Sequence, residues 1–188
     1  MKKLLVLGVG SSFIGMVLLV VGIATVGWLS VDLGFVKRES GLWQACTTRY
    51  GGTTSCAAYD MSLLSRNDHT YRAFAVIGAI LAISGVFTAC CGEGYDADKG
   101  KNGGGGSMIA AGVCGMIAAG VFILGSGGLS MASLYGYSFY LTWIQAVFTI
   151  GGGIAIIVAG GSATVQPGGE GTTTVQPADG GPATAQPV

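Results

Sequence analysis

Charged residues are scarce in this sequence. Of 188 residues, 10% are Asp, Glu, Lys or Arg, whereas 51% are hydrophobic. Soluble globular domains carry about 25% charged residues, so this composition excludes an ordinary soluble domain. Nine basic residues balance nine acidic ones, and we therefore expect no nucleic-acid partner.

Residues that carry chemistry are also scarce. The chain has one histidine, His69, and no second ligand is suitably placed to bind a metal with it. The glycine run at 103–106 is not preceded by a strand or followed by the lysine–serine pair of a phosphate-binding loop. We therefore expect no catalytic site, no cofactor and no metal, and we predict that the protein is not an enzyme.

Long uncharged runs dominate what remains. A helix needs about 20 apolar residues to cross the hydrocarbon core of a bilayer. Such runs predict four transmembrane helices, at residues 4–27, 73–91, 108–131 and 139–160. The first run is longer than the apolar region of a secretory signal, so we expect a retained helix. The remaining segments are a loop at 29–71, a glycine-rich linker at 92–107, a short loop at 132–138 and a tail at 163–188.

The cysteines indicate the orientation. Cys46 and Cys56 lie in the long polar loop, and disulfides persist on the oxidising side of a membrane. Cys90 and Cys91 lie at the other end of the second helix, where cytosolic cysteines are candidates for palmitoylation, although two unmodified thiols are the alternative. We therefore predict a multi-pass plasma-membrane protein with both termini and the 92–107 linker in the cytosol, and the other two loops outside.

The cysteine pair also predicts a local structure. Threonines flank Gly51 and Gly52, a pattern that favours two strands and a turn. A three-residue loop at 50–52, with Gly52 in the left-handed region, sets Cys46 directly opposite Cys56. We therefore predict a disulfide-linked hairpin, and the alternative is two unpaired thiols.

Small residues inside the helices predict where the helices touch, because they let backbones approach closely in lipid. The pairs and triplets spaced four apart are Ser11 and Gly15, Ala75 and Ala79, and Ala111, Gly115 and Ala119. Gln145 is the strongest polar group in a span, and we expect it to form a hydrogen bond with a neighbouring helix.

The loop carries a recognisable motif. The residues Gly41-Leu42-Trp43-Gln44-Ala45-Cys46, followed by Cys56, resemble the signature of the claudin superfamily. Trp28 before the motif and Arg72 at the start of the second helix match two further family positions, and residues 135–143 resemble the entry to the family's fourth helix. The resemblance covers about residues 1–160.

The resemblance implies a mainly α membrane protein. Its fold would be a left-handed bundle of four transmembrane helices over 1–162, capped by a small extracellular antiparallel sheet. The implied function is a junction protein that forms or regulates a paracellular barrier, through like molecules in cis and trans. The alternatives are an auxiliary subunit of an ion channel or receptor, and a structural protein of the myelin type.

Two details qualify the claudin-like function. In claudins, charges near the second cysteine set ion selectivity. The matching stretch here is 57–60, which ends in Tyr59 and Asp60; its one acid predicts at best a weak preference for cations, which Arg49 opposes. The second loop at 132–138 is shorter than the loop that claudins use for contact between cells. The spacing from Trp28 to Gly41 is nearer that of the myelin and epithelial membrane proteins.

The tail repeats a short unit every ten residues, with Gln-Pro at 166–167, 176–177 and 186–187. Its threonine, glycine and alanine spacers cannot bury a core, so a disordered cytosolic tail is expected. The terminal Val188 follows Pro187, which cannot donate a backbone hydrogen bond, and a PDZ partner is therefore not expected.

Overall fold

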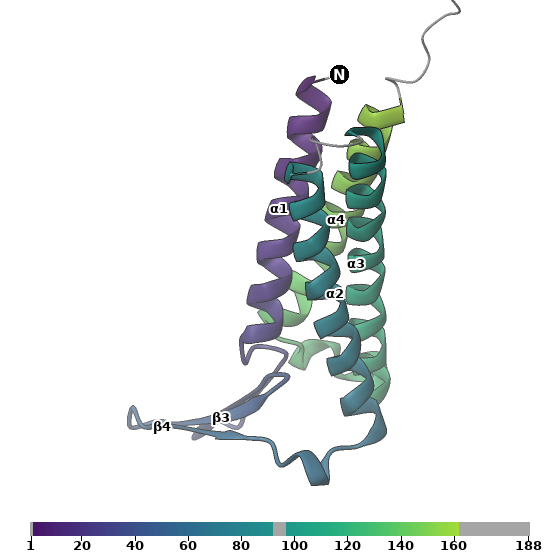
Figure 1. Cartoon of the computed structure of the whole chain (residues 1–188). Helices are drawn as coiled ribbons and strands as arrows, with labels where there is room; N and C mark the ends of the chain where they lie inside the picture. The colour runs from purple at the N-terminus through teal and green to yellow at the C-terminus, as the bar shows by residue number, and fades with distance from the viewer. Residues whose placement is uncertain (1, 92–96, 162–188) are drawn as a thin grey trace, which may run out of the picture.

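Four helices lie side by side in a bundle (Figure 1). The computed structural model describes residues 2–91 and 97–161, so the tail at 163–188 with its repeats lies outside the described residues. The helices are α1 (Lys2–Ala24), α2 (Arg66–Cys91), α3 (Ala97–Gly125) and α4 (Tyr137–Gly161). Each is long and apolar enough to cross a membrane. The start of α1 and the end of α4 lie at the same end of the bundle, as an even number of crossings predicts.

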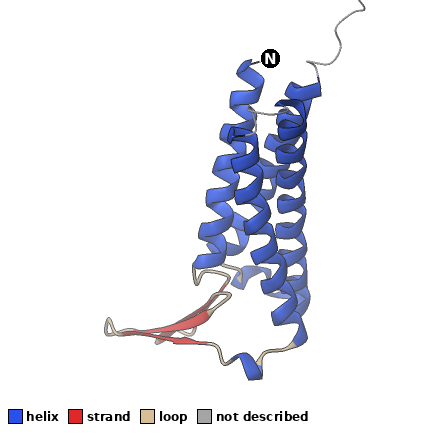
Figure 2. Ribbon diagram, viewed as in Figure 1, coloured by secondary structure: helices blue, strands red, loops and turns tan. Residues whose placement is uncertain are grey.

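A small sheet projects sideways from the opposite end of the bundle (Figure 2). Its four antiparallel strands follow one another in the order β1-β2-β3-β4. They are β1 (Leu29–Asp32), β2 (Val36–Ser40), β3 (Gln44–Arg49) and β4 (Thr54–Ala58). A 3-10 turn, η1 (Met61–Leu63), follows β4, and another, η3 (Gly128–Leu134), connects α3 to α4. The predicted fold class, four membrane helices with a small antiparallel sheet, is confirmed.

The hairpin of β3 and β4 has the predicted register. Cys46 pairs directly with Cys56, and the two form a disulfide with their Cα atoms 4.1 Å apart. The Arg49 backbone N–H donates to the Thr53 carbonyl at 3.1 Å, which leaves residues 50–52 as the loop. Gly52 has a φ of +88°, the left-handed conformation that this loop requires and that glycine adopts without steric cost.

Small residues bring the helices into contact, as predicted. The Ser11 hydroxyl donates to the Phe148 carbonyl at 3.0 Å and so links α1 to α4. Ala111 and Ala119 of α3 are fully buried. On α2 the buried stripe is broader than the predicted pair and contains Ala75, Gly78, Ala82, Gly85 and Ala89. α1 and α2 contact each other much less than the other neighbouring pairs.

The predicted start of the second helix at residue 73 is wrong, because α2 begins at Arg66. The Ser65 hydroxyl accepts from the Asp68 backbone N–H at 3.3 Å, while the Asp68 carboxylate accepts from the Ser65 backbone N–H at 2.9 Å. This reciprocal pair is a capping box, which satisfies donors that the first turn of a helix leaves free. The loop that begins at Leu29 is therefore shorter than predicted.

The prediction of a flexible linker over 92–107 is also wrong for most of that segment. Residues 97–107 belong to α3, and the glycines at 103–106 are helical. A Cβ at Gly104 would lie 2.9 Å from the Ala89 nitrogen, and one at Gly105 would lie 2.7 Å from the Gly153 carbonyl oxygen. Close packing against α2 and α4 thus overrides the low helix propensity of glycine.

Two further details differ from the sequence-based predictions. α3 ends at Gly125 rather than at residue 131, because Gly127 and Gly128 take positive φ values of 103° and 79°. Gln145 is fully buried, but its Oε1 accepts a hydrogen bond from Thr149 of its own helix at 3.4 Å. Its Nε2 has no partner among the described residues. The predicted hydrogen bond to another helix is absent from the described part of the chain.

Candidate functional site

The sheet is joined to the bundle through Trp28, which lies between α1 and β1. Its side chain is 0% exposed, and its Nε1 donates to the Gly22 carbonyl of α1 at 2.7 Å. Its ring packs edge-on against Phe122 of α3, with 5.0 Å between centroids, and stacks on Tyr71 of α2 at 6.5 Å. Phe139 of α4 completes this aromatic cluster at 6.4 Å. One side chain therefore contacts residues of all four helices.

The turn between β2 and β3 rests on the end of α1. A Cβ at Gly41 would lie 2.7 Å from the Thr25 carbonyl oxygen, so only glycine allows this approach. Leu42 is fully buried in the same core as Trp28. Trp43 is partly exposed, and its Nε1 donates to the Ile23 carbonyl at 2.9 Å. Gly41, Leu42 and Trp43 of the predicted motif thus each anchor the sheet in a different way.

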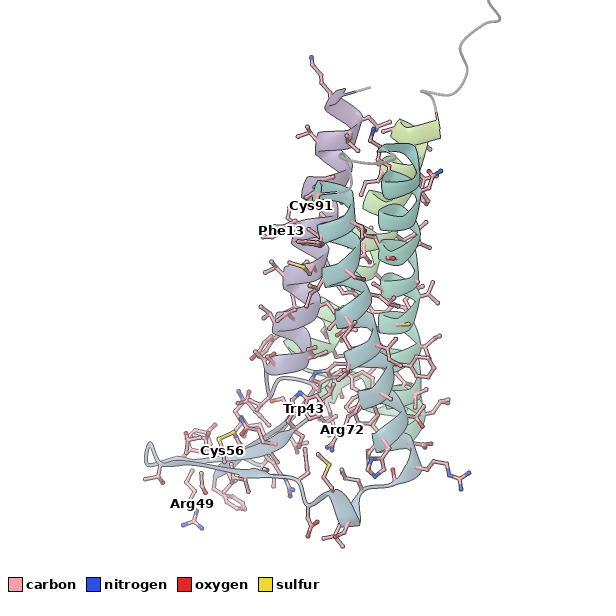
Figure 3. All side chains as sticks on the ribbon, viewed as in Figure 1. Phe13, Trp43, Arg49, Cys56, Arg72 and Cys91 are labelled. Carbon is pink, nitrogen blue, oxygen red and sulfur yellow. A yellow bond between two sulfur atoms is a disulfide. The ribbon has the colours of Figure 1, made fainter. Side chains whose placement is uncertain are left out.

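Arg72 lies in the angle between α2 and the sheet, close to Trp43 (Figure 3). Its guanidinium carbon is 5.6 Å from the centroid of the Trp43 ring and 5.2 Å from that of the Tyr59 ring. These distances allow cation–π attraction, which strengthens when the pair is desolvated. Arg72 therefore holds together α2, the β2–β3 turn and the segment after β4. We call these three side chains the arginine cage.

The remaining predicted site residues do not form one group. Arg49 lies at the end of β3 that is far from the bundle (Figure 3). Asp60 follows β4, whose last residues lie near the bundle. Asp60 caps η1, where its Oδ1 accepts from the Ser62 hydroxyl at 2.7 Å and the Ser62 backbone N–H at 3.0 Å. These two hydrogen bonds lower the pKa of the Asp60 carboxyl. Arg49 and Asp60 are thus separated by the length of the hairpin.

At the other end of the bundle, Cys90 and Cys91 are exposed thiols at the end of α2. Cys90 borders an apolar groove of about 520 Å³ between α1 and α2. The other residues that line it are Leu5, Val6, Val9, Gly10, Phe13, Val86 and Ala89. The two cysteines remain candidates for acylation.

Sequence reasoning missed one exposed apolar cluster. Leu33, Phe35 and Tyr50 lie in the two turns at the outer end of the sheet and are 59%, 73% and 72% exposed. The Tyr50 backbone N–H donates to the Phe35 carbonyl at 3.3 Å, so the two turns are adjacent. The sequence does indicate this turn, because two large apolar residues flank a glycine in Leu33-Gly34-Phe35. In the structure Gly34 has a φ of +83°. We call Leu33, Phe35 and Tyr50 the outer apolar cluster.

Comparison with protein families agrees with the anchored sheet and the four helices. The model of the PMP-22/EMP/MP20/Claudin family matches residues 1–156. The chain belongs to this family. The match covers all four helices except the last residues of α4, and it includes the motif, both cysteines of the disulfide and Arg72.

Membership of the PMP-22/EMP/MP20/Claudin family has two consequences. With four apolar helices, the chain is a multi-pass membrane protein whose environment is a lipid bilayer. The family is one of non-enzymatic membrane proteins. Within the described residues, no three His, Cys, Asp or Glu side chains come together to bind a metal. A comparison with curated proteins gives no match.

Proposed function

We propose that this chain is a claudin-like protein of cell junctions, which forms or regulates a paracellular barrier or an adhesion contact. In this proposal the sheet is extracellular and both termini are cytosolic. The partners are like molecules, in the same membrane and in the opposing one.

The observation that carries the proposal is the outer apolar cluster. Large exposed aromatic side chains are what protein interfaces bury, and charged side chains are depleted at interface cores. Here Phe35 and Tyr50 are exposed in the turns β1–β2 and β3–β4, at the end of the sheet that points away from the bundle (Figure 2 shows the direction of the sheet). A rigid anchor supports them, because the disulfide, Trp28 and Trp43 hold the strands in one orientation to the helices. Such an arrangement suits contact with a neighbouring molecule.

A barrier assay tests this proposal. The full chain is expressed in epithelial cells with leaky junctions, and its location and the transepithelial resistance are measured. We expect the protein at cell borders and a higher resistance. A double variant, Phe35→Ser with Tyr50→Ser, should reach the surface but lose the gain in resistance. Leu124→Ala is the matched control, because Leu124 is 77% exposed but belongs to α3 and not to the sheet.

Two outcomes would contradict the junction role. One is an even distribution over the cell surface with unchanged resistance, and the other is equal resistance with the double variant and the control. A tag after Val188 tests the orientation separately, because antibody should label it only after permeabilisation.

The groove between α1 and α2 supports a second candidate, an auxiliary subunit of a channel or receptor. Its apolar walls and a volume of about 520 Å³ suit the side chains of a partner helix. The short η3 connection also leaves little of the α3–α4 loop to project from the membrane. A pull-down in mild detergent should then recover a stoichiometric channel. Gly10→Leu, which fills open space in the groove, should lose that channel without changing surface expression.

If neither junction localisation nor a stoichiometric channel is observed, a structural role of the myelin-protein type is favoured. The three functions are therefore separated by two experiments, the barrier assay and the pull-down.

A further inference from the structure

Arg72 has hydrogen-bond donors that the described residues do not satisfy. The side chain is 5% exposed, yet its Nε and Nη2 have no partner within residues 2–91 and 97–161. Its Nη1 donates to the Met61 sulfur at 3.5 Å, and a thioether is a weak acceptor. A buried guanidinium normally has acceptors for its five N–H groups, so this environment is incomplete.

The acids around the arginine cage are bound elsewhere. The Asp68 carboxylate, one turn before Arg72, attracts the guanidinium electrostatically, but its hydrogen bonds come from the backbone N–H and the hydroxyl of Ser65 at 2.9 Å each. The Asp60 carboxylate accepts both bonds from Ser62. Arg72 forms no ion pair with any described carboxylate. Arg72 therefore has a positive charge and unpaired donors that an anion from outside the described chain would satisfy.

The position of Arg72 indicates which anion is available. No charged residue follows it until Glu93, so Arg72 is the last charge before the apolar part of α2 enters the membrane. Trp43, which covers the guanidinium, is bonded to the end of α1 at the same level. Tryptophan and arginine at helix ends lie at the depth of lipid headgroups. The anion found at that depth is the phosphate of a phospholipid.

The η1 segment that covers the cage is held by few contacts. Met61 and Leu63 of η1 are 58% and 84% exposed. The described hydrogen bonds of η1 go to the neighbouring Asp60, except for the one that the Met61 sulfur accepts from Arg72. Tyr59 also lines a cavity of about 120 Å³ with Asp68 and Tyr71, which leaves space for its ring to move. Displacing Met61 would free Nη1, and the guanidinium would then offer Nη1 and the unpartnered Nη2 to two phosphate oxygens.

We propose that Arg72 is a phosphate-binding site for the headgroup of a phospholipid in the leaflet on the sheet side. The phosphate displaces Met61, accepts from Nη1 and Nη2, and leaves the guanidinium between Trp43 and Tyr59. The sheet is then attached to lipid as well as to the bundle. This inference does not depend on the junction function.

The test uses the full chain purified in a maltoside detergent and native mass spectrometry. The probes are dioleoylphosphatidylcholine, dioleoylglycerol with the same chains but no phosphate, and inorganic phosphate. We expect the phospholipid to be retained and dioleoylglycerol not. Arg72→Gln should lower retention about tenfold, the loss expected for a charged hydrogen bond. Arg66→Gln, an exposed arginine on the same helix, should retain the phospholipid like the wild type.

A second variant covers the case in which Arg72→Gln does not fold. Met61→Ala keeps Arg72 but removes its cover, so phospholipid retention should rise. Competition by inorganic phosphate would support the oxyanion site but identify free phosphate as a second source. Equal retention of the phospholipid and dioleoylglycerol, or no change with either Arg72→Gln or Met61→Ala, would overturn the proposal.

Discussion

In the bundle, neighbouring backbones touch through glycine and alanine, whereas in the sheet the strands depend on ladder hydrogen bonds and one disulfide. The bundle buries many small residues along its whole length. The sheet buries few side chains, and β4 is exposed throughout. Between them lies the aromatic cluster around Trp28. The packing of the bundle therefore depends on many small contacts along its length, whereas the orientation of the sheet depends on a few side chains.

Trp28→Ala should have the largest effect, because it removes the side chain that both regions share. Truncating a buried tryptophan costs about 3–5 kcal/mol in folding free energy. It also removes the hydrogen bond from Nε1 to the Gly22 carbonyl. Unfolding of the purified protein, measured by circular dichroism in a series of denaturing detergent mixtures, gives the loss. Leu124→Ala, at an exposed position, is the control, and equal losses would contradict the anchor role.

Replacing both Cys46 and Cys56 with alanine should affect the sheet alone. A disulfide that closes a loop this short stabilises by about 2–3 kcal/mol in the chain-entropy model. Hydrogen exchange should therefore accelerate in β3 and β4 but stay unchanged in α3 and α4. Faster exchange throughout the helices would show that the two regions do not fold as separately as their packing suggests. Cys114→Ala removes a cysteine outside the sheet and serves as the control.

Gly105→Ala tests the packing of the bundle. An added Cβ would lie 2.7 Å from the Gly153 carbonyl oxygen of α4, and overpacking costs about 1–3 kcal/mol. Gly106→Ala, on the same helix, meets nothing within 4 Å and should be neutral or slightly stabilising. Detergent unfolding of the two variants side by side checks the difference. Equal stability would argue against close contact between α3 and α4 at this level.

Acid should have the smallest effect, confined to η1. Hydrogen bonds from Ser62 lower the pKa of Asp60, so the stabilisation is present above its ordinary pKa and is lost as pH falls through the lowered value. Below about pH 4, amide exchange at Ser62 should therefore accelerate relative to other amides. Asp60→Asn should remove this pH dependence, and its persistence in that variant would assign the effect to another group.

Several features of the fold were predictable from local patterns. The four helices follow from uncharged runs near bilayer length, and the register of Cys46 with Cys56 follows from loop length and Gly52. The start of α2 was also predictable from the sequence, because Ser65 and Asp68 have the spacing of a capping box. The helical glycines at 103–106 were not predictable from propensity, because contacts with Ala89 and Gly153 decide their conformation.

The residues of the candidate site were also predictable from the sequence, whereas their contacts depend on the tertiary structure. Trp28, the Gly41-Leu42-Trp43 motif and Arg72 were identified from their order along the chain. That Arg72 is buried between Trp43 and Tyr59 depends on how the loop after β4 returns to α2. The separation of Arg49 from Asp60 follows from the direction of β3 and β4, since one strand leads away from the bundle and the other returns.

By itself, the sequence determined the number of membrane crossings, the disulfide-linked hairpin and the motif of the family. Each of these depends on length, spacing or a single residue type. Stripes of small residues marked contact faces, but only the tertiary structure decided which helices meet through them and which residues surround Trp28 and Arg72. The physical reason is that α1, α2 and α3 are apolar around most of their circumference, so their hydrophobic pattern does not distinguish the lipid-facing side from the buried side. Close packing between small residues makes that choice.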